Sequence, residues 1–375
     1  MYASDPLAPS LHAHLWQSCP DRPVLYFSPK SLQENYRRFA SGFDGLVTYV
    51  VKANASCLVL DNLALAGLTT FDVASPVEMQ TVRAAVPNAV LHYHNPVRSP
   101  IEIAAAKRFG IRSWSVDSRE ELDKLSGLPS GAEIAVRLYV PVAGAAYDFG
   151  LKFGAGPAQA AALLRCVKQR GLTPSLTFHP GTQCTDPAAW VQYIDVAYEV
   201  SQRAETALKR LNVGGGFTVW RERQAPDLER VFDRISDQTI ALFRAKSPAL
   251  VCEPGRAMVA SAFTLAVKIK ALRGLRTLFL NDGIYGLLAE FRDLGVPQRY
   301  QLWRAGRRVT GPSAAYTVFG PTCDSIDQLP SPLHLPKSAQ EGDYLLFPAI
   351  GAYSLSLATS FNGYGGGDIV AVGDL

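Results

Sequence analysis

The sequence lacks the features that mark several large classes of protein. None of its apolar stretches approaches the roughly 18 uninterrupted residues of a transmembrane helix, and no apolar run follows a basic start. It has no run of lysine or arginine, and its formal net charge is only +4 with 19% charged residues. We therefore expect neither a membrane nor a nucleic acid among its partners.

Cysteine is scarce and scattered. The sequence has six cysteines, none in the paired spacing of a metal site: Cys19, Cys57, Cys166, Cys184, Cys252 and Cys323. His92 and His94 alternate on a candidate strand without a third partner at metal spacing, so we interpret both as structural. We predict no metal site, and we expect a soluble protein of a reducing, cytoplasmic compartment.

What remains is an ordinary globular composition. The chain has 375 residues, 48% of them apolar, which excludes disorder as its main character. At roughly 150 residues per domain, this length suggests two domains, or one large barrel with a smaller partner.

Short apolar segments alternate with helical segments between residues 45 and 253. Eight candidate strands are apolar on both faces, as in a buried parallel sheet: Leu46–Val51, Thr70–Ala74, Ala89–Tyr93, Arg112–Val116, Ile134–Tyr139, Pro174–Phe178, Leu211–Val213 and Ala249–Cys252. Capping serines start helices at Ser75, Ser99 and Ser118, and Gly42, Gly110 and Gly171 lie where helices should end. The pattern predicts an α/β fold, a (β/α)8 TIM barrel. An open doubly wound sheet is the alternative, but no dinucleotide fingerprint follows the first strand.

The pattern changes after Arg256. Ala262–Ala271, Thr277–Leu280, Tyr316–Phe319 and Asp343–Pro348 are candidate strands without regular helices between them, which indicates a mostly antiparallel β domain of sandwich or barrel type. An early strand at Arg22–Phe27 would complete it. We predict a barrel at residues 28–260 and a β domain at residues 1–27 and 261–375, with residues 1–20 as a loose or partner-facing lead-in.

Polar residues cluster where the barrel strands should end, which is where barrels carry their chemistry: Lys52, Asp72, Asn95, Arg137, His179, Gly214, Gly215, Gly216, Glu253 and Arg256. A glycine-rich turn, a guanidinium and the Thr182 hydroxyl suit a phosphate. A lysine in the barrel mouth suits an imine-forming, desolvated amine, although an ion pair with Asp72 or Glu253 is the alternative. Together these groups point to pyridoxal phosphate (PLP).

Seven segments in order along nearly the whole chain resemble motifs of the ornithine/diaminopimelate decarboxylase family, PLP enzymes with an alanine-racemase-like barrel: Tyr49–Asn54, Phe71–Ser75, Phe178–Thr182, Gly214–Phe217, Glu253–Arg256, Gly320–Asp324 and Gly351–Tyr353. The ornithine decarboxylase branch is the most similar, through Asn281–Gly286, Cys323–Asp327 and Ser360–Tyr364.

The resemblance implies roles for individual residues. Lys52 would hold PLP covalently, His179 would stack on its ring, and Glu253 would keep the ring nitrogen protonated. The phosphate would be held by Gly214, Gly215, Gly216, Gly255, Arg256, Tyr353 and Thr182. Asp72 and Arg137 would support Lys52. Across a homodimer interface, Cys323 would supply a proton and Asp324 would contact the distal amine of the substrate.

The implied reaction is decarboxylation of a basic L-amino acid, with L-ornithine, giving putrescine in polyamine biosynthesis, as the first expected substrate and L-lysine, giving cadaverine, as the second. A racemase is disfavoured because racemase relatives place an arginine where Glu253 stands, and a non-catalytic PLP-binding protein because such relatives consist of the barrel alone. The resemblance does not fix which residues contact the far end of the substrate. Tyr285 matches the family motif, whereas Asp293, the candidate substrate-binding acid, is one position out of register and follows Arg292. If Arg292 faces the pocket, a larger diamino or carboxylated substrate becomes the alternative.

Overall fold

The computed structural model describes residues 8, 10–142, 152–221 and 225–375. The chain divides into two compact units. The barrel unit comprises Asn35–Thr218 and Pro226–Met258, and the β unit comprises Met1–Glu34, Val219–Ala225 and Val259–Leu375. That the predicted boundaries, after residues 27 and 260, separate independent domains stays a prediction. No helix in the described ranges is both long enough and apolar enough to span a membrane.

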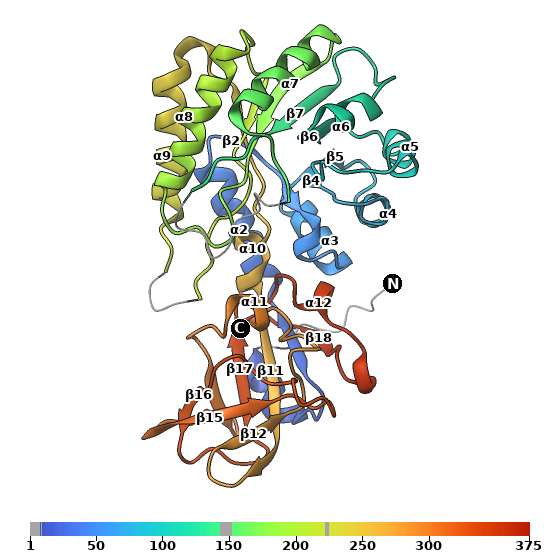
Figure 1. Ribbon diagram of the computed structural model, residues 1–375. Helices are drawn as coiled ribbons and strands as arrows, with labels where there is room; N and C mark the ends of the chain where they lie inside the picture. The colour runs from blue at the N-terminus through green and yellow to red at the C-terminus, as the bar shows by residue number, and fades with distance from the viewer. Residues whose placement is uncertain (1–7, 9, 143–151, 222–224) are drawn as a thin grey trace. The chain divides into compact units, whose positions relative to one another are not determined.

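The barrel unit is a parallel sheet with a helix after almost every strand (Figure 1). Its strands are β2 (Gly45–Val47), β3 (Tyr49–Val50), β4 (Thr70–Asp72), β5 (Val90–Tyr93), β6 (Ser113–Val116), β7 (Glu133–Arg137), β8 (Thr173–Thr177), β9 (Arg210–Asn212) and β10 (Ala249–Cys252). The predicted TIM barrel is confirmed, and each candidate strand lies within a few residues of an observed one.

The barrel closes through its first strand, which is split in two. β2 pairs with β10, whereas β3, directly after it in the chain, pairs with β4. Thr48 separates the two segments, and its backbone N–H and its hydroxyl both donate to the carbonyl of Cys252, at 2.9 and 3.1 Å. The sheet therefore begins and ends in one stretch of chain, which is how a sheet becomes a barrel.

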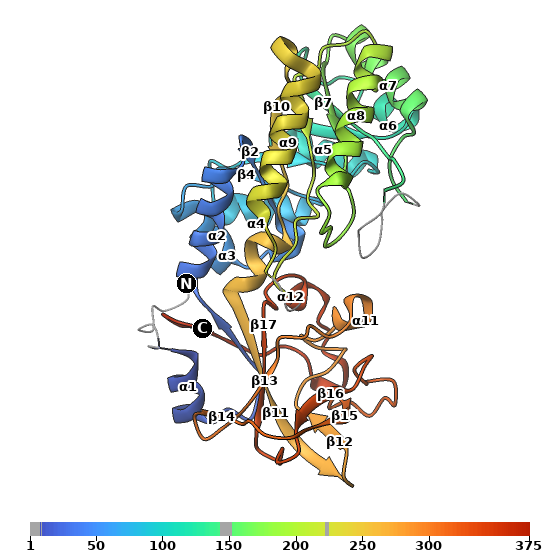
Figure 2. The same ribbon diagram turned by 90° about the vertical axis from the view of Figure 1, so that its left-hand side faces the viewer.

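Helices cover the outside of these strands: α2 (Pro29–Gly42), α3 (Cys57–Leu65), α4 (Pro76–Ala85), α5 (Pro100–Arg108), α6 (Arg119–Lys124), α7 (Pro157–Gln169), α8 (Ala188–Arg203), α9 (Leu228–Phe243) and the short α10 (Arg256–Val259). Figures 1 and 2 both show α7, α8 and α9 side by side. The predicted serine caps are confirmed, since Ser75, Ser99 and Ser118 each accept a hydrogen bond from the backbone N–H three residues later.

The β unit is a mixed sheet, mostly antiparallel (Figure 2). Its strands are β1 (Val24–Phe27), β11 (Phe263–Arg273), β12 (Thr277–Leu280), β13 (Gln301–Arg304), β14 (Arg307–Arg308), β15 (Ser313–Phe319), β16 (Leu333–Pro336), β17 (Tyr344–Pro348) and β18 (Asp368–Ala371). β1 pairs antiparallel with β11, the longest strand, and parallel with β18. An N-terminal strand therefore lies between segments from the C-terminal part of the chain.

The expectation of a loose lead-in over residues 1–20 is wrong for its second half. Leu11–Ser18 forms helix α1, capped by Ser10, whose hydroxyl accepts from the backbone N–H of Ala13. Leu11 and Leu15 are buried against Val24, Tyr26 and other residues of the sheet. The apolar face of this short helix is small, but it completes a core that also includes Ala266, Tyr344, Leu346 and Val372 from the C-terminal part of the chain.

Candidate active site

Lys52 lies just past the end of β3, in the single 3₁₀ turn Val51–Ala53. The Tyr49 hydroxyl donates to the carbonyl of Asn54 at 3.0 Å and braces this turn. The Lys52 side chain is exposed in the described chain, which differs from the desolvated amine expected from the sequence. Its charge acts on Asp72 and His179, so the amine lies near both groups.

The triple glycine after β9 forms a turn with no room for side chains. Gly214 and Gly216 have φ of +67° and +86°, conformations that favour glycine. A Cβ at Gly214 would lie 2.1 Å from the Phe178 carbonyl oxygen, and one at Gly215 would lie 2.8 Å from that of Glu253. Among the described residues, no acceptor takes the backbone N–H of Gly215 or Gly216. The turn thus offers two amide donors at a bare backbone, as a phosphate or another anion requires.

His179 lies beside this turn, on the loop after β8. A Cβ at Gly215 would come 3.0 Å from its Nε2. Its Nδ1 accepts a hydrogen bond of 3.1 Å from the Gly181 N–H, and burial, with the nearby charges of Arg137 and Lys52, lowers its pKa to about 3. The imidazole is therefore neutral, with its proton on Nε2. Phe178, which directly precedes His179, anchors the loop by stacking on Tyr193 of α8, with ring centroids 4.6 Å apart.

The cationic and hydroxyl groups predicted for a phosphate lie after β8 and β10, and Arg137, predicted to support Lys52, ends β7. Arg256 opens α10 and Thr182 belongs to the His179 loop, and both are buried. Gly255 immediately precedes Arg256, and its carbonyl accepts from the N–H of Met258 at 3.1 Å. Arg137, the last residue of β7, lies over the ring of Phe153 at 5.1 Å and interacts with the charge of Glu253.

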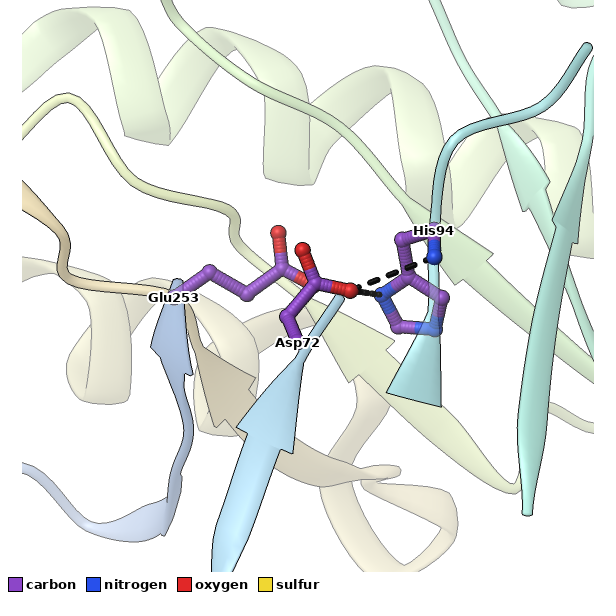
Figure 3. A group of neighbouring side chains, drawn as sticks. All are labelled: Asp72, His94 and Glu253. Carbon is purple, nitrogen blue, oxygen red and sulfur yellow. Dashed lines mark hydrogen bonds and ion pairs between the residues drawn. The ribbon is translucent and has the colours of Figure 1, made fainter. Parts of the chain in front are cut away.

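A buried cluster joins Glu253 to Asp72 and His94 (Figure 3). His94 Nδ1 contacts Glu253 Oε1 and lies 3.7 Å from Asp72 Oδ1, and the backbone N–H of His94 donates to the same Asp72 oxygen at 3.2 Å. Asn212 Nδ2 donates to Glu253 Oε1 at 2.6 Å. Within the described residues, both hydrogen bonds to the Glu253 side chain end on Oε1.

The pKa values of the two carboxyl groups in this cluster are shifted in opposite directions. Burial, aided by the charge of Glu253, raises the pKa of Asp72 far above its usual range. Burial also opposes the charge of Glu253, but the charge and hydrogen bond of His94 and the bond from Asn212 outweigh it and lower its pKa. Burial alone would lower the pKa of His94, yet the neighbouring Glu253 raises it. Glu253 is therefore the ionised acid at neutral pH and Asp72 the protonated one.

The remaining predicted residues belong to the β unit. The Tyr285 hydroxyl contacts Asp324, and the Cys323 Sγ donates to Asn362 Oδ1 at 3.2 Å. Phe361 packs against Tyr285 with ring centroids 5.0 Å apart. Segments around residues 285, 324 and 362 are thus brought together.

Three other predictions lie elsewhere in the β unit. Tyr353 precedes the short helix α12 (Ser354–Leu357), in the left-handed conformation with φ of 63°. Arg292 and Asp293 both lie on the single turn α11 (Phe291–Leu294), where Arg292 Nε donates to the Ala289 carbonyl at 3.1 Å. Neither side chain is buried.

The barrel residues fit PLP. The bare glycine turn with two amide donors and the buried Arg256 suit its phosphate, and the neutral His179 beside the turn suits its ring. The ionised Glu253 has one oxygen without a protein donor among the described residues, as a protonated ring nitrogen requires. Lys52 lies at the same end of the barrel for its aldehyde.

Sequence reasoning missed His94 and Asn212. The sequence pattern indicated a structural His94, without a third partner at metal spacing, and did not reveal that Asp72 and Glu253 approach it from other strands. Two signals were available. His94 follows His92 by two positions, which places both on one face of an extended segment, and Asn212 is the last strand residue before the glycine turn.

Comparisons with known proteins agree with this geometry. Residues 30–260 match the family model of the pyridoxal-dependent decarboxylases, pyridoxal binding domain. Decarboxylase flvG of Aspergillus flavus is 32% identical over 337 residues, covering 84% of this chain and 77% of that protein. The lysine/ornithine decarboxylase of Selenomonas ruminantium is 32% identical over 352 residues, covering 91% and 87%.

A solved structure extends the likeness to both units. The arginine decarboxylase of Paramecium bursaria Chlorella virus, bound to agmatine, superimposes with a TM-score of 0.85 at 25% identity, covering 94% of this chain and 98% of that chain. The family match spans the barrel that carries Lys52 and Glu253. The chain belongs to the pyridoxal-dependent decarboxylase family, as a carboxy-lyase with pyridoxal phosphate as its cofactor.

Proposed function

We propose that this protein decarboxylates a basic L-amino acid, with L-ornithine as its main substrate, giving putrescine and CO₂, and L-lysine as a second substrate, giving cadaverine. The observation that carries the proposal is the buried, ionised Glu253 with one oxygen left for a ring nitrogen. The names of the relatives support it, since the Selenomonas ruminantium protein is a lysine/ornithine decarboxylase.

The residues divide the work as follows. When bound, PLP supplies a sink for the electron pair that remains on the substrate Cα after CO₂ leaves. Lys52 Nζ would hold the cofactor aldehyde until the substrate amine takes its place. Glu253 Oε2 would accept a hydrogen bond from the cofactor's ring nitrogen and keep that nitrogen protonated, which would favour decarboxylation over racemisation.

In this proposal, residues of the β unit contact the substrate. Asp324 carries the carboxylate for the distal ammonium group, and Cys323 Sγ gives a proton to Cα. We further propose that these two residues act in the other subunit of a homodimer. Mixing Lys52→Ala and Cys323→Ala subunits tests this: composite sites would restore about a quarter of wild-type activity, because half of the dimers are hybrids and each has one intact site. No recovery would place both residues in one subunit's site.

Two measurements test the function itself. The purified protein should be yellow, and borohydride should bleach it by reducing the C=N bond to Lys52, as peptide mapping would show. Release of labelled CO₂ from L-ornithine, L-lysine and L-arginine should then be strong in the wild type and absent in Lys52→Ala. A colourless protein that takes up no added PLP, or full activity of Lys52→Ala, would overturn the proposal.

One observation favours a second substrate class. Arg292 precedes Asp293 on α11, so the segment that offers an acid for a diamine also offers a guanidinium for a carboxylate. Values of kcat/KM for L-ornithine, L-lysine, L-arginine and meso-diaminopimelate decide between them. A preference for diaminopimelate that Arg292→Gln abolishes would establish the second class, and an ornithine preference that Arg292→Gln leaves intact would exclude it.

A further inference from the structure

We propose that His94 is a positioning residue for Glu253: its Nδ1–H holds Oε1 of Glu253, so that Oε2 is presented, ionised, to the cofactor ring. This inference rests on the proposed function, because it gives Glu253 the role of ring-nitrogen partner. His94 lies outside every motif that carries the family resemblance, and it touches the cofactor in no part of the scheme.

The donor on His94 follows from the surrounding bonds. The Asn212 side chain is oriented by the N–H of Gly214, which donates to its Oδ1 at 2.9 Å. Its Nδ2 must therefore face Glu253 Oε1, 2.6 Å away. Nδ1 of His94 lies 3.2 Å from that Nδ2 and contacts the same Oε1. Since an ionised carboxylate only accepts, the proton on this side of the imidazole is on Nδ1.

The opposite side of the ring is also fixed. His94 Nε2 lies 3.0 Å from the hydroxyl of Ser113, the first residue of β6, and this hydroxyl either donates or accepts. The imidazole is thus clamped between two barrel strands. Two donors converge on Oε1, which leaves Oε2 as the oxygen that faces no protein donor among the described residues.

Charged and titratable groups face this cluster from several strands. Asp72, Glu133 and Glu253 act on His94. His94, His179, Arg137, His92 and Asp72 act on Glu253. Because the pair is buried, a direct hydrogen bond to Glu253 counts for more than it would in water.

His92 supplies a matched control. It is buried on β5, two positions before His94, and its ring centroid is 5.4 Å from that of His94. Its Nδ1 has no hydrogen-bond partner in the described part of the protein. A substitution there disturbs the same layer of the barrel without touching Glu253.

Substitutions of His94 by asparagine and by glutamine test the roles of its two ring nitrogens one at a time. In His94→Asn the amide N–H takes the place of Nδ1–H toward Glu253, whereas in His94→Gln it takes the place of Nε2 toward Ser113. We expect His94→Gln to lower kcat about 10- to 100-fold with little change in KM, the loss typical of a hydrogen bond to a charged group. His94→Asn should stay within about threefold of the wild type, as should His92→Asn.

A spectroscopic readout separates positioning from general damage. In the PLP-loaded protein without substrate, the pH at which the absorption band changes should fall by about one unit in His94→Gln, because the ring nitrogen loses its proton more easily. His94→Asn and His92→Asn should titrate as the wild type does. His94→Leu, which has no donor, should match His94→Gln, and circular dichroism would check folding of each variant.

Three results would overturn the inference. They are a wild-type titration and kcat in His94→Gln, an equal loss in His92→Asn, and stoichiometric metal bound to the wild type in a His94-dependent way. Failure of the proposed function is distinguishable, since it appears as a wild type that releases no CO₂ from any basic amino acid, whereas the spectral comparison needs only PLP binding.

Discussion

The hydroxyl of Tyr285 donates a hydrogen bond of 2.6 Å to Oδ2 of Asp324, a residue 39 positions further along the chain. This bond and that from the Ile326 N–H lower the pKa of Asp324, so its carboxylate stays ionised at neutral pH. An ionised acid held by a tyrosine at a fixed place is suited to a substrate ammonium group. Asp324 is therefore the residue whose substitution should most directly affect binding of that group.

Replacing Asp324 with asparagine should weaken binding of the distal ammonium group. We expect kcat/KM for L-ornithine to fall about 10- to 100-fold in Asp324→Asn, mainly through KM, and less in Tyr285→Phe, which loses only the brace. Steady-state kinetics on L-ornithine check this. Asp368→Asn is the control, because Asp368 is exposed on β18 and should leave kcat/KM unchanged. Equal KM values for Asp324→Asn and the wild type would contradict the assignment.

A second acid, Asp327, holds the Cys323–Asp324 loop. It is 1% exposed, and its carboxylate accepts from the N–H of Ile284 at 3.0 Å and from the N–H and hydroxyl of Thr322 at 3.1 and 2.7 Å. Asp327→Ala leaves these buried donors without an acceptor, so we expect it to lower the free energy of unfolding by about 3 kcal/mol. Urea unfolding measures this, with Asp368→Ala as the control. A loss below 0.5 kcal/mol, taken as roughly the range of neutral surface changes, would show that the loop is held otherwise.

Local sequence signals explain why the barrel was predictable. Most barrel strands are short apolar runs that alternate with helices along the chain, and the strand Thr277–Leu280 of the β unit, also a short apolar run, has its predicted bounds. The strands that were missed, such as β14 and β18, are short and largely exposed, and they form because partners far along the chain pair with them. Helix α1 was missed because only the folded sheet supplies the apolar surface on which Leu11 and Leu15 pack.

The residues of the candidate site also fall into those that local sequence motifs predict and those that depend on distant strands. Lys52, Glu253 and the glycine turn were predictable, because chemistry in a barrel gathers where strands end and each group carries a motif. The contacts of His94 were not predicted, because its partners come from the ends of β4, β9 and β10, and no local pattern reveals a contact between strands that closure brings together. The break of the first strand at Thr48 has a similar cause, since it depends on a bond to Cys252.

A side chain in the glycine turn should weaken the affinity for the cofactor. A methyl group at Gly215 would lie 2.8 Å from the Glu253 carbonyl oxygen and 3.0 Å from His179 Nε2, so Gly215→Ala must displace one of them. We expect its affinity for PLP to fall at least about tenfold, measured by fluorescence titration of the cofactor-free protein. Gly156→Ala is the control, because nothing lies within 4 Å of a Cβ there. Wild-type affinity in Gly215→Ala would show that this turn does not approach the cofactor.

The buried His92 should make the fold sensitive to acid. Burial, reinforced by the charge of His94, lowers its pKa from 6.5 to about 3. Between these two values the unfolded chain binds a proton that the folded chain does not, so stability falls as pH falls below 6.5. From pH 7 to pH 5 this costs about 2 kcal/mol, and His92→Gln should remove that part of the loss. Urea unfolding at both values measures the difference, with the exposed His334→Gln as the control. An unchanged difference in His92→Gln would mean that the folded protein accommodates a protonated His92.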